Sequence, residues 1–246
     1  MSEENLILTG EPAEPPLLEN VDPEVLQRNV AHVLDVLSKN RYQTLSAAKL
    51  IAVTKTVGPR VIEALKPLQI LDIAENRVQA ALPKLSQIAP DFRLHWIGRL
   101  QTNKVKYIID HVCMVHTLDR MALAQELNRR AGMRGRVMPA LVQVNIAGES
   151  QKAGLDSTEV RFFLQKMKDF PNIRVKGLMA MMPLLAEDRQ LAEWFRGIRR
   201  LFDGIREDAM DGVEMEELSM GMSNDYAIAA REGATMVRVG TALYQK

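Results

Sequence analysis

Eight short apolar stretches recur along the chain, and a segment with the spacing of an amphipathic helix separates each stretch from the next. One such segment carries Val160, Phe163 and Leu164 on a single helical face. Strands that alternate with helices predict a parallel sheet, and eight of them predict an α/β fold closed as a (β/α)8 TIM-type barrel. A doubly wound open sheet is the alternative. The stretches are residues 50–53, 70–74, 93–97, 113–116, 140–145, 175–180, 217–220 and 236–239.

The order of these segments predicts a single folded domain with an N-terminal arm. Residues 1–20 contain several prolines and glutamates and little that a core could bury, so we expect a mobile arm. Residues 21–246 are expected to form the barrel, starting with a helix from Pro23 to about Ser38. The sequence stops soon after the eighth stretch, and we therefore expect the first helix to fill the gap in the outer ring.

Charge and apolar content exclude several classes of protein. The formal net charge is +1 and the basic residues are spread along the chain, so we expect no nucleic-acid partner. No apolar run is long enough to span a bilayer, and the N-terminus lacks the order of a signal peptide, so we expect no membrane partner. The single cysteine, Cys113, permits no internal disulfide. These features together predict a cytoplasmic protein.

Polar residues follow the predicted strands, whereas the strand interiors read as largely apolar. In a barrel the C-terminal ends of the strands meet at one mouth, where the chemistry takes place. We therefore expect the residues near these ends to surround the mouth. They are Lys55, Asn76, His95, His116, Asn145, Met179, Met222, Ser223, Arg238, Gly240 and Thr241.

The segment from Leu218 to Tyr244 predicts a site for an anion. It reads as strand, turn, short helix, strand and turn, with Gly221 in the first turn and Gly240 in the second. Ser223 and Thr241 each place a hydroxyl near a glycine where a helix is expected to start, and free N–H groups attract anions there. Barrels often bind phosphate between the loops after strands seven and eight. Two ordinary α/β connections are the alternative interpretation.

Lys55 follows the first predicted strand, and we expect it to face the mouth opposite the phosphate turns. Most lysines in such a place are solvated surface groups, but a lysine at a barrel mouth can form a Schiff base with an aldehyde. A lysine, a phosphate pocket and a ring-sized gap between them together indicate pyridoxal 5′-phosphate (PLP). His95 and His116 alternate with apolar neighbours, as core or rim histidines do, and no histidine spacing resembles a metal site.

Seven motifs stand in order along the chain, and they are IAVTK (51–55), AENRVQA (74–80), HWIGRLQTNK (95–104), VNIAGESQKAGL (144–155), GLMAMMP (177–183), LSMGMSND (218–225) and VRVGTALY (237–244). On these motifs the sequence resembles the pyridoxal phosphate homeostasis proteins, a family of single-domain PLP binders. The resemblance covers the chain from the first helix to Tyr244. It implies the barrel of the alanine racemase N-terminal domain, which is the type III fold of PLP proteins.

The resemblance also implies roles for single residues. It implies a PLP aldimine on Lys55, with Arg238 beside the pyridine nitrogen. It implies phosphate contacts from Ser223, Gly240 and Thr241. The other expected cofactor contacts are Asn76, His95, Asn145, Met179 and Met222. The expected partners are PLP itself and apo PLP-dependent enzymes as clients, and the expected oligomeric state is a monomer.

The residues themselves bear on whether such a protein is an enzyme. Arginine stays charged at ordinary pH and disfavours a proton on a pyridine nitrogen beside it, which weakens PLP as an electron sink. A racemase also needs a base on each face of the cofactor, and alanine racemase takes one of them, a tyrosine, from another domain and subunit. The tyrosines here, none at a convincing strand end, are Tyr42, Tyr107, Tyr226 and Tyr244. We expect a carrier or regulator of PLP rather than an enzyme. The alternatives are a weak amino-acid racemase and a metabolite-binding barrel with a surface Lys55.

Overall fold

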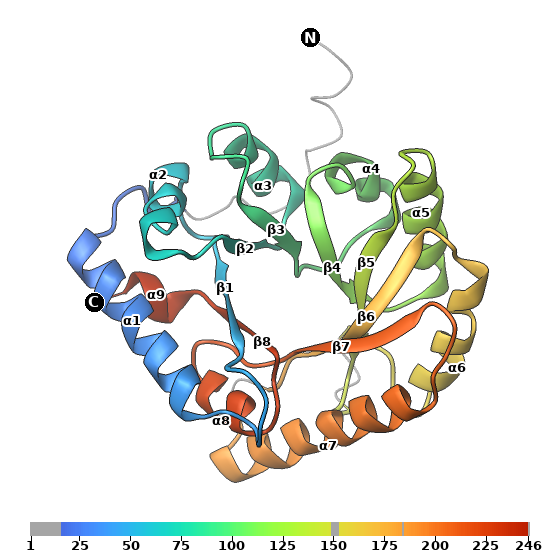
Figure 1. Ribbon diagram of the computed structural model, residues 1–246. Helices are drawn as coiled ribbons and strands as arrows, with labels where there is room; N and C mark the ends of the chain where they lie inside the picture. Colours follow the sequence, from blue (N-terminus) through green and yellow to red (C-terminus); the bar gives the residue numbers. More distant parts are fainter. Residues whose placement is uncertain (1–15, 149–152, 184, 246) are drawn as a thin grey trace.

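The computed structural model describes residues 16–148, 153–183 and 185–245. Within these ranges eight parallel strands close into a barrel in sequence order, so the predicted (β/α)8 fold is confirmed and the open sheet is excluded (Figure 1). Each predicted apolar stretch overlaps one strand. The strands are β1 Lys49–Val53, β2 Asp72–Glu75, β3 Arg93–Trp96, β4 Val112–Leu118, β5 Met138–Val144, β6 Ile173–Ala180, β7 Val213–Ser219 and β8 Met236–Val239.

Closure of the barrel joins its first and last strands. β1 pairs with β2 on one side and with β8 on the other, so that Ile51 lies opposite Arg238 and Ala52 lies opposite Val239. Because residues on paired parallel strands advance together, the turns that follow Val53 and Val239 leave the barrel side by side. The turns after the first and the last strand therefore build one sector of the mouth.

Helices surround the barrel and cover the outer faces of the strands (Figure 1). The α-helices are α1 Pro23–Lys39, α2 Pro59–Glu63, α3 Val78–Leu85, α4 Val105–Ile108, α5 Met121–Gly132, α6 Val160–Gln165, α7 Asp188–Glu207, α8 Tyr226–Arg231 and α9 Thr241–Tyr244. Short 3-10 helices extend the connections, namely η2 Lys66–Leu68, η3 Thr102–Lys104 and η4 Met167–Asp169. Across the described ranges, no helix combines the length and the apolar character that a membrane crossing requires.

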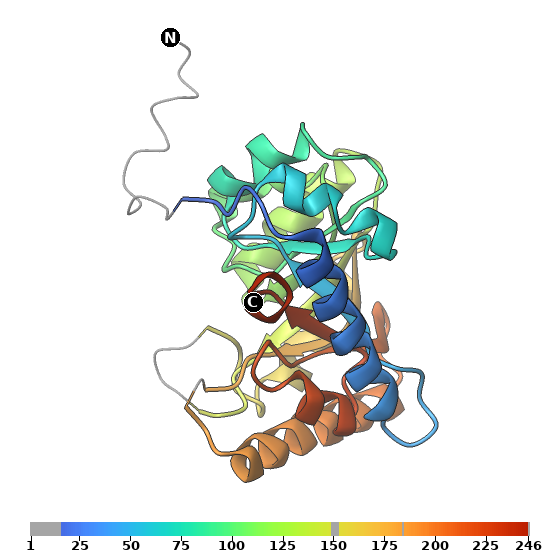
Figure 2. The ribbon, with the colours of Figure 1, turned by 90° about the vertical axis from the view of Figure 1, so that its left-hand side faces the viewer.

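The N-terminal helix completes the ring as predicted. The four-residue helix α9 follows β8, and α1 packs against both α9 and α8 (Figures 1 and 2). Seen from the side, the connection from α1 to β1 and residues 145–148, which follow β5, lie at opposite ends of the barrel (Figure 2). The mouth is the end that carries residues 145–148, since they leave the C-terminal end of β5.

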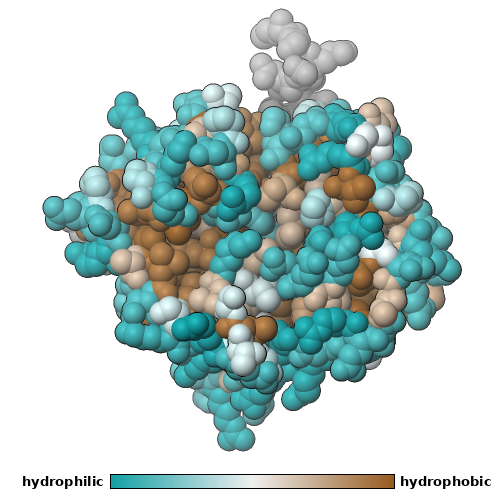
Figure 3. All heavy atoms as spheres, in the orientation of Figure 1, coloured by the Kyte–Doolittle hydropathy of each residue, from teal (hydrophilic) through white to brown (hydrophobic). Residues whose placement is uncertain are grey.

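Most buried apolar side chains lie between the barrel and the helices. Leu26 of α1, Trp96 of β3, and Phe195 and Phe202 of α7 all belong to this layer. A fully buried side chain such as leucine or phenylalanine contributes about 1.5–3 kcal/mol through the hydrophobic effect. Hydrophobic side chains gather between α1 and the barrel on the face drawn in Figure 3. This layer fixes the strands whose ends carry the site.

The interior of the barrel is more polar than the sequence suggested. Its small apolar cluster consists of Ile51, Val53, Ala74 and Met236. A hydrogen bond from β4 to β7, strands that are not neighbours in the sheet, shows that polar side chains also lie inside. The strand residues are largely apolar, as expected, but the polar ones that face the inside of the barrel satisfy one another by hydrogen bonds. The polar residues inside the barrel include Asp72, His95, His116, Ser219 and Arg238.

The end of the predicted N-terminal arm runs beside the loop after β1. Residues 1–15, which make up most of that arm, lie outside the described residues, and their mobility stays a prediction. The backbone N–H of Leu18 donates to the carbonyl of Thr56, and the carbonyl of Leu18 accepts from the N–H of Gly58. This short parallel bridge lies next to the turn that carries Lys55.

Candidate functional site

Lys55 lies in the turn directly after β1, and its side chain is exposed to solvent. Two residues earlier, Val53 belongs to the interior cluster, so Lys55 continues the inward side of the strand to the mouth. A Cβ atom added to Gly240 would lie 3.2 Å from the Cβ of Val53, which places the turn after β8 against β1. We expected Lys55 opposite the phosphate turns. Barrel closure instead puts it on the strand next to one of them.

Ser223 joins the two turns that the sequence predicts as a phosphate site. Its Oγ accepts hydrogen bonds from the backbone N–H of Gly240 at 3.2 Å and from that of Ala242 at 3.3 Å. These bonds are long, since N–H···O distances cluster at about 2.9–3.0 Å. An oxygen that carries negative charge is a stronger acceptor for such donors than a hydroxyl. The turns after β7 and β8 therefore converge on one polar cup, and Thr241 is exposed beside it.

The turn after β7 depends on a glycine. Gly221 has a φ of +94°, and a Cβ atom there would lie 2.6 Å from the Cβ of Ala229 on α8. Asp225 then accepts a hydrogen bond from the backbone N–H of Met222 at 2.5 Å, and α8 begins after it. This tight turn brings the hydroxyl of Ser223 to the backbone beyond β8. Because that contact joins two separate loops, sequence spacing alone did not show it.

Arg238 supplies a buried positive charge below the mouth. It precedes Gly240 by two residues on the inward side of β8, and its side chain is 2% exposed. Nη1 donates to Ser219 Oγ at 2.6 Å, and Nη2 donates to the carbonyl of Ala180 at 2.9 Å. Burial lowers the pKa of Arg238 to about 10, against an opposing effect of the Asp225 charge. The guanidinium therefore stays charged at neutral pH.

Arg238 begins a chain of hydrogen-bonded side chains across the inside of the barrel, here called the interior chain. Ser219 Oγ lies 3.1 Å from His116 Nδ1. His116 Nε2 lies 2.9 Å from His95 Nδ1. His95 Nε2 lies 3.0 Å from Asp72 Oδ1. The chain thus runs from β8 through β7, β4 and β3 to β2.

The ends and the middle of the interior chain have defined charges. Burial by itself raises the pKa of Asp72, but hydrogen bonds from Arg93 and His95 outweigh it and hold the pKa well below its usual range. Asp72 is therefore a carboxylate. Burial lowers the pKa of His116 well below the usual value, assisted by His95 when that ring is protonated and by the charge of Arg238. His116 is therefore neutral.

The predicted site residues occupy two levels of the barrel. Those at the mouth are exposed or half-buried, and they are Lys55, Asn76, Asn145, Met222, Ser223, Gly240 and Thr241. Those below it are buried, and they are His95, Met179 and Arg238. Met179 pairs in register with Ser219 on β7, so it lies at the level of the interior chain. His95 belongs to that chain rather than to the rim.

The sequence interpretation missed Asp72 and Ser219 and left His116 without a role. A signal for two of them was present in the alternation of strand residues. Asp72 lies two residues before Ala74 of the interior cluster, and Ser219 lies two residues before the turn glycine Gly221. Alternation followed strictly along each predicted strand would have placed both inside the barrel.

A buried ion pair beside the site was also missed. Lys84 Nζ donates to Glu75 Oε1 at 2.9 Å and to the carbonyl of Thr54 at 2.8 Å. The hydroxyl of Thr54 donates to the same carboxylate oxygen at 2.7 Å. The pair ties α3 and β2 to the residue that precedes Lys55. Its signal in the sequence was the position of Lys84 three residues after Ala81, on the apolar stripe of its helix.

A hollow of about 420 Å³ lies away from these residues. It is lined in part by Ala147 of the loop after β5, Pro183 of the loop after β6 and Trp194 of α7, and it contains none of the predicted cofactor contacts. Among the residues that the structure describes, no group of three or more His, Cys, Asp or Glu side chains is placed to hold a metal ion. The chemistry on which the site can draw is thus the polar cup, the exposed lysine and the buried arginine.

The family model of the alanine racemase N-terminal domain matches residues 21–246. A pyridoxal phosphate homeostasis protein of Aquifex aeolicus is 39% identical over 200 residues, which are 81% of this chain and 87% of that protein. Another, of Synechocystis sp., is 36% identical over 202 residues, which are 80% of this chain and 91% of that protein. The chain belongs to the pyridoxal phosphate homeostasis protein family. The resemblance inferred from the seven motifs is thereby confirmed.

Solved structures of both higher and lower sequence identity show the same barrel. PipY of Synechococcus elongatus with PLP bound is 30% identical, with a TM-score of 0.79 over 89% of this chain and 100% of that one. The structure of PipY without PLP gives a TM-score of 0.81. Alanine racemase of Clostridium difficile is 14% identical, with a TM-score of 0.76 over 96% of this chain and 60% of that one. That last likeness shows the fold alone.

Proposed function

We propose that this chain binds PLP at the barrel mouth and acts in PLP homeostasis as a carrier or regulator. The observation that carries the proposal is the cup formed by Ser223 Oγ and the N–H groups of Gly240 and Ala242, next to the strand that leads to Lys55. A hydroxyl and two N–H groups are a suitable donor set for a phosphate. The PLP-bound structure of PipY and the names of the curated relatives support the choice of ligand.

The other residues of the site fit a phosphorylated aromatic aldehyde. Lys55 offers an exposed primary amine, which condenses with an aldehyde to a Schiff base and releases one water molecule. Arg238 presents N–H donors and no acceptor, so it suits a ring nitrogen that accepts a hydrogen bond. We propose that the remaining contacts to the cofactor come from Asn76, His95, Asn145, Met179, Met222 and Thr241.

The site favours holding PLP over catalysis. Arg238 stays charged, which disfavours a proton on a ring nitrogen beside it. A racemase would also need a second base, and the tyrosines near the site are poorly suited to that role. Burial raises the pKa of Tyr226 and raises that of Tyr244 further, which makes both hydroxyls harder to ionise. The curated relatives carry the name of a homeostasis protein.

We further propose that the protein acts in the cytoplasm as a monomer and passes PLP to apo PLP-dependent enzymes. The exposure of Lys55 supports this role, because water or an amine of a client enzyme can reach a Schiff base at the rim of the barrel. A cofactor enclosed by the barrel would be released much more slowly. The clients would therefore compete with Lys55 for the aldehyde.

Borohydride reduction of the PLP-loaded protein should place the pyridoxyl group on Lys55. Reduction turns the Schiff base into a stable secondary amine that peptide mass mapping can locate. The Lys55→Ala variant should lose the label and the absorbance of the Schiff base. Lys49→Ala, at the opposite end of β1, is the matched control and should keep both. Label on another lysine, or none in a loaded sample, would disprove the assignment.

The Ser223→Ala variant should bind PLP about 10- to 150-fold more weakly than the wild type. That range corresponds to about 1.5–3 kcal/mol for the loss of one hydrogen bond to a charged group. The measurement is the dissociation constant for PLP, compared at matched thermal stability. Ser86→Ala, at the exposed end of α3, is the control and should not change the constant. An unchanged constant in Ser223→Ala would remove Ser223 from the site.

In deuterium oxide, alanine mixed with a stoichiometric amount of the PLP-loaded protein should exchange its Cα proton for deuterium very slowly. The reasons are the charged Arg238, which disfavours a proton on the ring nitrogen, and the raised pKa values of Tyr226 and Tyr244, which make them poor second bases. NMR of the alanine Cα signal measures the exchange. Exchange or racemisation at rates of about 1–10³ per second, as enzymes show, would favour the racemase alternative. Arg238→Glu should raise any residual exchange if PLP still binds, because a carboxylate favours protonation of the ring nitrogen.

A further inference from the structure

The interior chain connects a group that can only donate hydrogen bonds to a group that can only accept them. Arg238 has five N–H donors and no acceptor, and the Asp72 carboxylate has acceptors and no donor. Arg93 fixes the acceptor end, because its Nε donates to Asp72 Oδ1 at 2.8 Å and its Nη2 donates to Oδ2 at 2.6 Å. The three members between these ends each have at least one donor and one acceptor when both histidines are neutral.

With both histidines neutral, the hydrogen bonds of the chain can run in only one direction. Asp72 can only accept, so His95 must carry its proton on Nε2, which leaves His95 Nδ1 as an acceptor. His116 must then carry its proton on Nε2 and donate to His95 Nδ1. His116 Nδ1 is left as an acceptor for the hydroxyl proton of Ser219, whose oxygen accepts from Arg238. In this state both histidines are the Nε2–H tautomer.

We infer that Asp72, His95, His116 and Ser219 are positioning residues, whose one-way chain of hydrogen bonds holds the Arg238 guanidinium below the mouth with only donors available to a ligand. The inference rests on the proposed function for the identity of that ligand. Two guanidinium donors are used by Ser219 and by the carbonyl of Ala180. A ligand atom that meets Arg238 therefore has to be an acceptor, which for PLP means an unprotonated ring nitrogen.

Two substitutions of His116 separate positioning from simple packing. In His116→Gln, the amide oxygen can accept from Ser219 and the amide nitrogen can donate to His95, so the direction of the chain is retained. In His116→Leu both hydrogen bonds are lost, and the hydroxyl of Ser219 is free to turn away from Arg238. If His116 served only to fill space, His116→Gln would disturb the site at least as much as His116→Leu, since leucine packs at least as well as glutamine against apolar neighbours.

The first test uses the full-length protein without added PLP, with nitrogen-15 in histidine and arginine, at pH 8. NMR should show His95 and His116 with protonated Nε2 and bare Nδ1, assigned by their variants against the exposed His32 and His111. The Nη signals of Arg238 should be resolved in the wild type and in His116→Gln, and averaged by rotation in His116→Leu. Protonated Nδ1 on either histidine, or unchanged Arg238 signals in His116→Leu, would overturn the inference.

The second test loads the same proteins with PLP that carries nitrogen-15 in its ring. The wild type and His116→Gln should show an unprotonated ring nitrogen. In His116→Leu the ring signal should shift, and the dissociation constant should rise about 5- to 10-fold, the effect of one lost hydrogen bond. If His116→Leu does not fold, Ser219→Ala replaces it, and unchanged ring and Arg238 signals there would refute the inference. If PLP does not bind the wild type, the proposed function fails, while the histidine and Arg238 signals of the first test still decide the inference.

Discussion

The Lys84→Met variant should lose about 3–5 kcal/mol of unfolding free energy, the cost of removing one partner of a buried ion pair. The side chains of Lys84 and Glu75 are 4% and 2% exposed, and their charged atoms lie 2.9 Å apart. Without the lysine, the carboxylate of Glu75 stays buried with one positive charge fewer beside it. The carbonyl of Thr54 also loses its side-chain donor. Urea unfolding at pH 8, with the denaturant slopes compared, measures the loss.

Two further variants check the cause of that loss. Lys66→Met removes the lysine of the half-exposed pair with Asp91, and it should leave stability nearly unchanged because water screens such pairs. Adding Glu75→Gln to Lys84→Met should restore part of the stability, since a neutral amide replaces the buried carboxylate. If Lys84→Met costs no more than Lys66→Met, the buried pair is not what stabilises this corner of the barrel. Weaker labelling of Lys55 in Lys84→Met would show that the pair also positions the turn after β1.

The protein should lose stability as the pH falls below about 6.5, because His116 is buried in its neutral form. A lowered folded pKa means that the folded state binds fewer protons than the unfolded state. The contribution of His116 is therefore fully present above the unfolded value of about 6.5 and is lost as the pH falls towards the folded value. Within that window the loss is up to about 1.4 kcal/mol for each pH unit.

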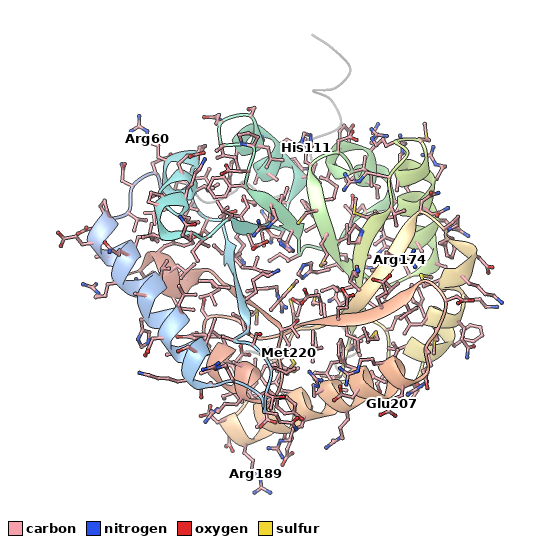
Figure 4. All side chains as sticks on the ribbon, in the orientation of Figure 1. Arg60, His111, Arg174, Arg189, Glu207 and Met220 are labelled. Atoms are coloured by element: carbon pink, nitrogen blue, oxygen red, sulfur yellow. The ribbon has the colours of Figure 1, made fainter. Side chains whose placement is uncertain are left out.

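The His116→Gln variant should remove this part of the pH dependence while keeping most of the stability at pH 8. Glutamine does not titrate, and it can keep both neighbours of His116 in the interior chain. His111→Gln is the control, because His111 is exposed on the connection between α4 and β4 (Figure 4). The unfolding free energy of each variant is measured relative to the wild type at pH 8 and again at pH 5. The contributions of Asp72 and Asp225 to the pH dependence are common to the wild type and the variants, so they largely cancel. Equal pH dependence in the wild type and His116→Gln would contradict the assignment.

The site could be predicted in part because some of its residues lie within one continuous segment. Ser223, Gly240 and Thr241 stand on consecutive strand ends, and a glycine beside a hydroxyl indicates a tight turn whatever lies around it. Lys55 could be placed near the mouth because it follows an apolar strand directly. The expectation that Lys55 lies opposite the phosphate turns was wrong. Only the closure of the sheet decides that β1 lies beside β8, and this makes Lys55 adjacent to the phosphate turns rather than opposite them.

The sequence by itself determined the eight strands, their alternation with helices and the turns at their ends, because these depend on local spacing and on backbone preferences. The tertiary structure decided which polar side chains meet inside the barrel. His116 and Ser219 are 103 residues apart in the chain, and Lys84 meets the carbonyl of Thr54 across 30. Whether such groups come within hydrogen-bonding distance depends on the stagger and tilt of closed strands. Local sequence pattern does not encode that geometry, so the interior chain became visible only in the folded barrel.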